Sequence, residues 1–158
     1  MPVSSQLIQF LRRGFFLDWG GVHGAPHWAR VRENGLRLSA STGANTKVVE
    51  AFAFLHDSQR VNDGHDPDHG PRAAELARRL PKSLLDLTHS EVEILATACN
   101  GHTGGIIDAD ITVCTCWDAD RLDLGRVGIV PDPARLCTDA ARDPEILRWA
   151  YARSTRGS

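Results

Sequence analysis

The feature that most constrains this chain is an apolar run that ends in an adjacent histidine and aspartate. Residues 49–55 read VEAFAFL, and six of these seven side chains are apolar, Glu50 being the exception. His56 and Asp57 follow directly. Such a run belongs in a core, where a charged group is costly unless it is paired or bound to a metal. The sequence therefore predicts a buried metal site that receives further His and Asp ligands from elsewhere in the chain.

Apolar side chains recur at helical spacing along most of the chain, with little of the alternation that is typical of strands. Asn45 stands at a helix-capping position, and Thr88 and Glu91 have the spacing of a capping box. The β-branched residues 111–113 leave a strand open as an alternative there. We predict an all-α bundle of seven or eight helices. They cover residues 4–18, 26–40, 46–59, 69–80, 88–100, 110–124, 133–142 and 144–153.

Length and composition predict one globular domain over residues 1–158. The net charge of -2 gives no electrostatic reason to expect polymeric nucleic acid or an anionic membrane as a partner. No apolar stretch is long enough for a transmembrane helix, and the basic residues Arg12 and Arg13 interrupt what a secretory signal would keep apolar. The four cysteines lack zinc-pair spacing, which favours reduced core thiols in a cytoplasmic protein. A homo-oligomer stays open.

Several other histidines and aspartates stand near the ends of predicted helices, where they could join His56 and Asp57. Helical folds build metal sites from side chains of separate helices that face one interior. Imidazole and carboxylate ligands suit Mn, Fe, Co, Ni or Zn, so the predicted cofactor is a divalent transition metal, as one or two ions. The candidate ligands are His27, His56, Asp57, His69, His102 and Asp120, with Asp118 as an alternative to Asp120.

These residues stand in motifs that resemble the HD-domain metal-dependent phosphohydrolase superfamily. His27, then His56-Asp57, then Asp120 follows its H…HD…D pattern. The segments HWARV, FLHDSQR, HGPRAAELA, GHTGG and DADRLDLG resemble its helices and turns in the same order, from about His27 to Gly125. The resemblance implies an HD-domain helical bundle in which His27, His56, Asp57 and Asp120 bind a first metal. By the same resemblance Asp57 would bridge to a second ion held by His69 and His102.

Other residues have simpler interpretations. His23 could cap a helix near the glycine-rich segment, and His89 lies within a capping box and is expected at the surface. His65 and Asp66 fall in the polar loop 60–68, where exposure is the default. Asp63 or Asp66 is a weaker candidate for a general acid.

The predicted chemistry is phosphoester hydrolysis of a small molecule, with a nucleotide favoured. A divalent metal lowers the pKa of a bound water and polarises a phosphoryl oxygen. Negative charge gathers on that oxygen in the transition state, so cations should line the pocket. We name Asp57, Arg60 and Asp120 as catalytic residues, and Arg60, Arg72 and Arg121 as substrate-binding residues.

Three alternatives are left open. Cleavage of a monoester and of a diester cannot be separated, and a dinucleoside polyphosphate is an open substrate class. A di-iron HD-type oxygenase would need both His69 and His102 as ligands. A catalytically weak nucleotide-binding module would bind the same partner, a small phosphorylated molecule, without turning it over.

Overall fold

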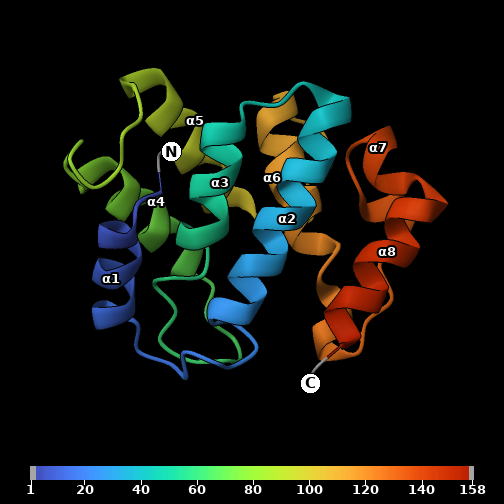
Figure 1. Cartoon of the computed structure of the whole chain (residues 1–158), viewed down its shortest axis with the longest axis horizontal. Coiled ribbons are helices and arrows are strands. Elements are labelled where there is room, and N and C mark those ends of the chain that lie inside the picture. Colours follow the sequence, from blue (N-terminus) through green and yellow to red (C-terminus); the bar gives the residue numbers. More distant parts are fainter. Residues whose placement is uncertain (1–2, 157–158) are drawn as a thin grey trace.

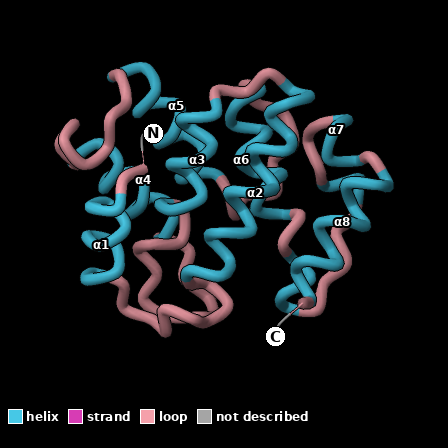
Figure 2. The backbone as a smooth tube through the Cα atoms, in the orientation of Figure 1, coloured by secondary structure: helices cyan, strands magenta, loops and turns pink. Residues whose placement is uncertain are grey.

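The structure is a computed structural model that describes residues 3–156, and these residues form a bundle of helices joined by loops (Figures 1 and 2). The described residues form no named strand; Val3 and Leu85 make an isolated antiparallel bridge. No described helix has the length and hydropathy to cross a membrane. The elements are α1 (Ser5–Gly14), α2 (Ala25–Thr42), α3 (Thr46–Leu55), α4 (His69–Arg79), α5 (His89–Gly101), α6 (Ile111–Arg121), η1 (Leu124–Val127), η2 (Pro133–Arg135), α7 (Asp139–Arg142) and α8 (Pro144–Thr155).

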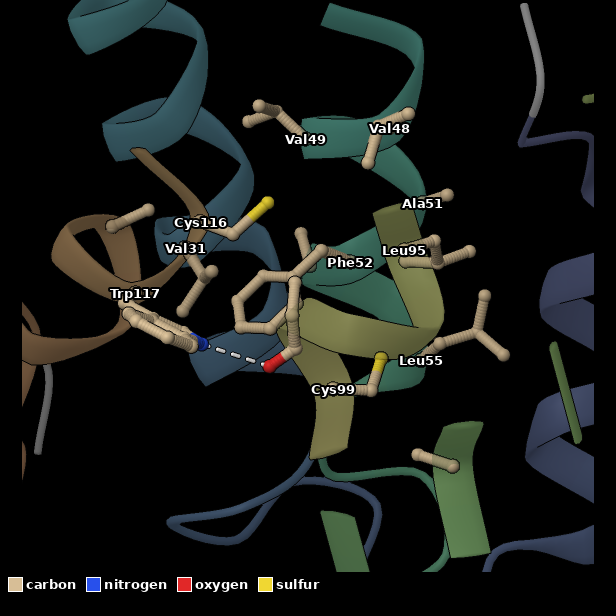
Figure 3. Packing of buried hydrophobic residues seen from close by; sticks show 14 of the residues in the cluster. Val31, Val48, Val49, Ala51, Phe52, Leu55, Leu95, Cys99, Cys116 and Trp117 are labelled. Atoms are coloured by element: carbon tan, nitrogen blue, oxygen red, sulfur yellow. Dashed lines mark hydrogen bonds between the residues drawn. The ribbon is translucent and has the colours of Figure 1, made fainter. Parts of the chain in front are cut away.

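Helix α3 is largely buried and lies between α2, α5 and α6, while α4 packs against α5 (Figure 1). Phe52 and Leu55 of α3 contact the core next to Leu95 of α5 (Figure 3). Burying each large apolar side chain stabilises the fold by about 1.5–3 kcal/mol. On the other side Trp117 of α6 donates its indole N–H to the carbonyl of Ala98 at 2.9 Å. The apolar run identified in the sequence therefore forms the helix against which the other helices pack, and the ends of these helices carry the candidate ligands.

The helix starts follow the capping chemistry predicted from the sequence. The Asn45 side chain accepts the backbone N–H groups of Lys47 and Val48 at the start of α3. Thr88 and Glu91 form both bonds of a capping box at the start of α5. Residues 111–113 are helical, so the strand alternative is wrong.

Several helix ends were predicted too far along the chain. Helix α1 ends at Gly14 instead of residue 18, and α6 ends at Arg121 and is followed by η1. The prediction for α3 extended to residue 59, but the helix ends at Leu55 and residues 56–59 form a turn. His56 Nδ1 contacts the carbonyls of Phe52 and Ala53, and the Ser58 hydroxyl donates to the carbonyl of Leu55. Side chains thus satisfy carbonyls that a longer helix would have used.

The single helix predicted over residues 133–142 is also wrong. The chain forms η2, becomes extended at Leu136, and resumes as the one-turn helix α7. The backbone N–H groups of Cys137 and Thr138 donate to the carboxylate of Asp118, both at 2.8 Å. A continuous helix would turn these donors toward its own carbonyls, so the bonds to Asp118 interrupt it.

Gly70, the second residue of α4, allows a close approach between α4 and α5. A Cβ atom at this position would lie 2.5 Å from the carbonyl oxygen of Cys99, closer than real Cβ atoms come to backbone. The missing side chain therefore lets His69 approach His102 at the end of α5.

Candidate metal centre

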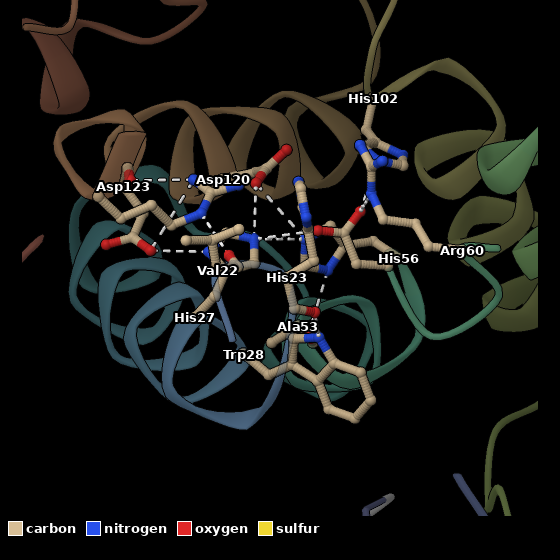
Figure 4. Close-up of polar contacts among 12 residues, drawn as sticks. Val22, His23, His27, Trp28, Ala53, His56, Arg60, His102, Asp120 and Asp123 are labelled. Carbon is tan, nitrogen blue, oxygen red and sulfur yellow. Dashed lines mark hydrogen bonds and ion pairs between the residues drawn. The ribbon is translucent and has the colours of Figure 1, made fainter. Parts of the chain in front are cut away.

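The candidate ligands come from five elements whose ends meet at one side of the bundle. His27 lies in the first turn of α2, His56 caps the end of α3, His69 begins α4, and His102 caps the end of α5. Asp120 lies in the last turn of α6. Figure 4 shows His27, His56 and Asp120 turned toward one another, with His102 beside them. We call the six residues His27, His56, Asp57, His69, His102 and Asp120 the His/Asp cluster.

One half of the cluster gathers around one oxygen of Asp57. The Nε2 atoms of His27 and His56 lie 3.0 Å apart. Asp57 Oδ2 lies 3.3 Å from His27 Nε2 and 3.5 Å from His56 Nε2. Asp120 Oδ1 lies 3.2 Å and 3.4 Å from the same two nitrogens. These distances bring two imidazoles and two carboxylates to a single point.

The other half gathers around the second oxygen of Asp57. Asp57 Oδ1 lies 3.1 Å from His69 Nε2 and 3.5 Å from His102 Nε2. The two Nε2 atoms are 2.9 Å apart. Asp57 thus presents one oxygen to each pair of histidines, which is the arrangement of a carboxylate that bridges two cations. Donor atoms of His27, His56 and Asp57 all lie within 4.8 Å of one another, and so do those of Asp57, His69 and His102.

The opposite ring nitrogen of every cluster histidine faces a hydrogen-bond acceptor. Nδ1 of His56 contacts the carbonyls of Phe52 and Ala53, Nδ1 of His69 that of Asp66, and Nδ1 of His102 that of Cys99. Nδ1 of His27 contacts the carboxylate of Asp123 at 2.7 Å. Acceptors at Nδ1 place the proton there and leave the lone pair of a neutral ring on Nε2.

This tautomer makes the cluster fit a metal. Two Nε2 lone pairs that face each other at 2.9–3.0 Å, beside carboxylate oxygens, repel one another unless a cation lies among them. Neutral imidazole nitrogens and ionised carboxylates are the ligands that divalent transition metals use. The donors of the His/Asp cluster therefore fit such an ion in both halves.

The carboxylates of the cluster are held ionised. Burial alone would raise the pKa of Asp57, but the electrostatic effect of His56 and the close contacts of its oxygens with His102, His27 and His69 bring it well below the usual value. Burial likewise opposes ionisation of Asp120, and His56 and His27 outweigh it and bring its pKa well below the usual value. Both side chains are thus ready to bind a cation at neutral pH.

His27 carries the proton that balances these carboxylates in the metal-free protein. Burial and the charge of Arg126 lower its pKa, but contacts with Asp120, Asp123 and Asp57 outweigh them and raise it to about 9. The pKa of His27 is higher in the folded metal-free protein than the ordinary value of 6.5, so protonation of His27 stabilises this fold. The contribution is fully present below about pH 6.5 and is lost as the pH rises through about 9.

Metal binding at pH 7.5 is therefore expected to release about one proton, because a ligating His27 must lose its Nε2 proton. Calorimetric titration of Mn²⁺ in buffers of different protonation enthalpy measures this number. The apparent affinity should rise by about tenfold per pH unit between pH 6.5 and 8.5. Heats that do not depend on the buffer would contradict a protonated His27.

Asp118, the alternative ligand, has a different place. Its carboxylate accepts the N–H groups of Cys137 and Thr138 and the Thr138 hydroxyl, each at 2.8 Å. Burial raises its pKa in spite of these bonds. No contact joins it to a cluster histidine in residues 3–156. Asp120 is therefore the aspartate that this geometry offers to a metal.

Comparison with solved structures identifies the fold. The chain is similar to the crystal structure, at 1.45 Å resolution, of a predicted HD superfamily hydrolase from an uncultured Thermotogales bacterium. The two are 24% identical, with a TM-score of 0.71 over 93% of this chain and 84% of that chain. The fold is an HD-domain fold. No protein-family model matches the sequence, and no curated protein matches it. The fold predicted from the sequence resemblance is thus confirmed.

A cavity of about 670 Å³ opens over the His/Asp cluster. Asp57, His102 and Asp120 lie at its polar end. Four arginines also line it: Arg60, Arg121, Arg126 and Arg135. Cations beside a metal-ligating cluster suit an anionic substrate.

The three arginines predicted to bind substrate differ in their placement. Arg60 lines the cavity, and its Nε donates to Asp57 Oδ1 at 3.3 Å. Arg121 also lines the cavity and donates to the carbonyls of Ile106 and Arg135. Arg72 does not line it, because both oxygens of Asp66 bind its guanidinium at 2.7 Å. Arg72 therefore braces the loop 60–68 and is not placed to contact substrate in this cavity.

The loop carboxylates proposed as a general acid do not line the cavity either. Asp66 is buried and also accepts the backbone N–H of Val61, so it stabilises the loop fold. Asp63 is exposed and contacts Nδ1 of His23 at 2.8 Å. His65 and His89 are exposed, as predicted.

Sequence reasoning missed two residues next to the cluster. Asp123 is fully buried and holds both His27 Nδ1 and the Arg30 guanidinium at 2.7 Å. It follows Asp120 by three residues, a helical spacing that could have indicated a shared side. His23 is buried, lines the cavity, and has its pKa lowered, chiefly by burial. Its four-residue spacing from His27 was visible, but nothing in the sequence showed that Asp63 would orient its ring.

Proposed function

We propose that this chain is a metal-dependent phosphohydrolase that cleaves a phosphoester of a small molecule, with a nucleotide as the favoured substrate. The observation that carries the proposal is the Asp57 carboxylate. It presents one oxygen to each of two histidine pairs beside an arginine-lined cavity. The HD-domain fold, shared with a predicted hydrolase, supports the hydrolytic part of the proposal.

His27, His56, Asp57 and Asp120 would hold a first ion, and Asp57, His69 and His102 a second. Divalent ions at these positions would lower the pKa of a water and polarise the phosphoryl oxygens. Asp123 fixes the ring of His27 through Nδ1, and main-chain carbonyls fix the other three rings. Such partners keep Nε2 directed at the cluster and make the ring a better ligand.

Arg60 and Arg121 are the two side chains that would bind the phosphoryl group directly. Arg60 lies within reach of the cluster, because it already contacts Asp57. Charge that develops on the phosphoryl oxygens in the transition state would be stabilised by these guanidinium groups. The loop 60–64 holds Arg60 in place, since its Nη1 donates to the carbonyls of Asn62 and Gly64.

Hydrolysis of a panel of nucleoside monophosphates and nucleotide diesters tests the proposal. Released phosphate is measured for the monoesters, and the monoester or alcohol product is measured for the diesters. The purified protein is assayed with Mn²⁺, Fe²⁺, Co²⁺ or Ni²⁺, and its metal content is measured in the same samples. We expect turnover with at least one of these ions and loss of turnover after chelation. A fully metal-loaded protein that hydrolyses no monoester and no diester of the panel would overturn the proposal.

A di-iron oxygenase is the second candidate, because His69 and His102 both lie in the cluster and a second ion is what that chemistry requires. Anaerobically reconstituted iron protein would then consume oxygen in the presence of its substrate. Phosphate release without oxygen consumption would exclude this candidate.

Replacing His102 by Gln is expected to reduce the bound metal from about two ions to about one per chain, because the second half of the cluster loses one of three ligands. Metal analysis after dialysis gives the stoichiometry. His89→Gln is the matched control, since His89 is exposed and far from any cluster ligand in the sequence. Equal metal content in His102→Gln and the wild type would contradict a second ion at this position.

A further inference from the structure

The segment between α6 and α7 supplies an apolar wall to the cavity, next to the polar end formed by the His/Asp cluster. Its apolar lining residues are Leu124, Val127, Ile129, Val130, Pro131 and Leu136. Val127, Ile129 and Val130 leave 45%, 50% and 69% of their surface exposed. We propose that residues 127–131 bind the organic group of the substrate, and that this group is apolar or aromatic. The inference rests on the proposed function, because it assigns the other end of the same phosphoester.

The cavity is the size of a small-molecule site. Such sites span about 300–1,000 Å³, and 670 Å³ is far more than a phosphoryl group needs. A phosphoester with its phosphorus near Asp57 and Asp120 must place its organic group in the remaining space. That space is bounded mainly by the segment 124–136, which includes Arg135. Aliphatic side chains there favour an apolar or flat group over a polyhydroxylated one.

The wall is held in place before any ligand binds. Arg126 donates from Nε to the carbonyl of Val22 and from Nη1 to the carbonyl of Asp123. Gly128 adopts a positive φ of 83°, which a residue with a Cβ atom rarely does, and this turn lets the chain reverse between Val127 and Ile129. The backbone N–H of Ile129 donates to the carbonyl of Leu124 at 3.2 Å. A fixed wall loses little conformational entropy on binding, which suits a specificity element.

The charges beside the wall favour an anionic ligand. Within residues 3–156, neither Arg121 nor Arg135 forms an ion pair with a carboxylate, although both line the cavity. Arg121 instead donates to main-chain carbonyls. Apolar surface beside unpaired cations fits a molecule with an apolar body and an anionic end, such as an aryl phosphate. This surface suits a second copy of the chain less well. If two copies packed through the same surface, the four arginines of one copy would face those of the other.

The experiment compares α-naphthyl phosphate with β-glycerol phosphate on the metal-loaded protein. We expect a higher kcat/KM for the naphthyl ester. Ile129→Ser should lower that value by about tenfold and leave the glycerol ester within about twofold. The matched control is Ile107→Ser: Ile107 is 45% exposed, against 50% for Ile129, but lines a different cavity. Calorimetry measures binding of the same two esters, which keeps affinity separate from turnover.

Each outcome decides a separate point. Binding of α-naphthyl phosphate that Ile129→Ser weakens, without hydrolysis of either ester or of any phosphoester in the nucleotide panel, would support the wall and refute the proposed function. Hydrolysis of both esters at equal efficiency, unchanged in Ile129→Ser, would refute the wall and leave the function standing. A dimer in light scattering that Ile129→Ser dissociates, with no preference for the naphthyl ester, would assign the surface to a second copy of the chain and overturn the inference.

Discussion

Replacing Asp57 by Asn is expected to remove bound metal from both halves of the His/Asp cluster and to lower phosphoester turnover by at least about a thousandfold. A factor of this size corresponds to about 4 kcal/mol of transition-state stabilisation, within the several kcal/mol that a metal ion supplies. Asp57 is the one cluster residue whose two carboxylate oxygens approach different histidine pairs. No other single substitution in the cluster should have so large an effect.

The physical reason is that an amide can replace only one of the two oxygens. The new NH₂ group would face one pair of Nε2 atoms as a donor, and the negative charge that attracts cations to both halves would be lost. Loss of this carboxylate should also lower the pKa of His27, since Asp57 is among the groups that raise it. The lost oxygen removes a ligand. The lost negative charge removes part of the attraction that held the other ligands together.

Metal analysis, phosphate release and thermal unfolding of the variant check this prediction. Asp132→Asn is the matched control, because Asp132 also lines the cavity but contacts no cluster residue, and Asn can still cap η2. The control should retain metal and turnover. A folded Asp57→Asn protein that keeps both ions would show that the cluster is not a metal centre.

The sequence was sufficient to single out the residues of the His/Asp cluster because they carry local signals. His56-Asp57 ends an apolar run, His69 precedes a helix with a clear apolar face, and His102 follows a helix that a capping box begins. Each signal fixes a residue at a helix end, and the HD resemblance then supplies which ends meet. These helices and their starts were therefore predictable without coordinates.

What was not predictable depends on residues that are distant in the sequence. Asp118 interrupts the helix expected over 133–142 by binding two N–H groups nineteen and twenty residues later. Asp66 takes Arg72 away from the cavity, and Asp63 orients His23 forty residues before it. The apolar wall at 127–131 has no periodic pattern, since its shape comes from the Gly128 turn and the anchors of Arg126. Such pairings follow from tertiary contacts that no local propensity encodes.

Two acidic positions on α6, separated by Ala119, should respond in different ways to the same substitution. Asp120→Asn is expected to reduce the rise in melting temperature that metal causes, because the first half of the cluster loses a charged ligand while the second half keeps its three. Asp118→Asn should keep that rise. Instead it should lower the free energy of unfolding by about 1–3 kcal/mol, since its new NH₂ group would face backbone donors of Cys137 or Thr138 inside the protein.

Thermal unfolding of the two variants, with and without Mn²⁺, separates the two roles. The informative quantity is the metal-induced shift in melting temperature, because it compares each variant with its own metal-free form. If Asp118→Asn lost this shift and Asp120→Asn retained it, the ligand would be Asp118, and the register of the last aspartate would have to be moved by two residues. The expected result, a full shift only in Asp118→Asn, would connect the end of α6 to the metal through Asp120 and to the C-terminal segment through Asp118.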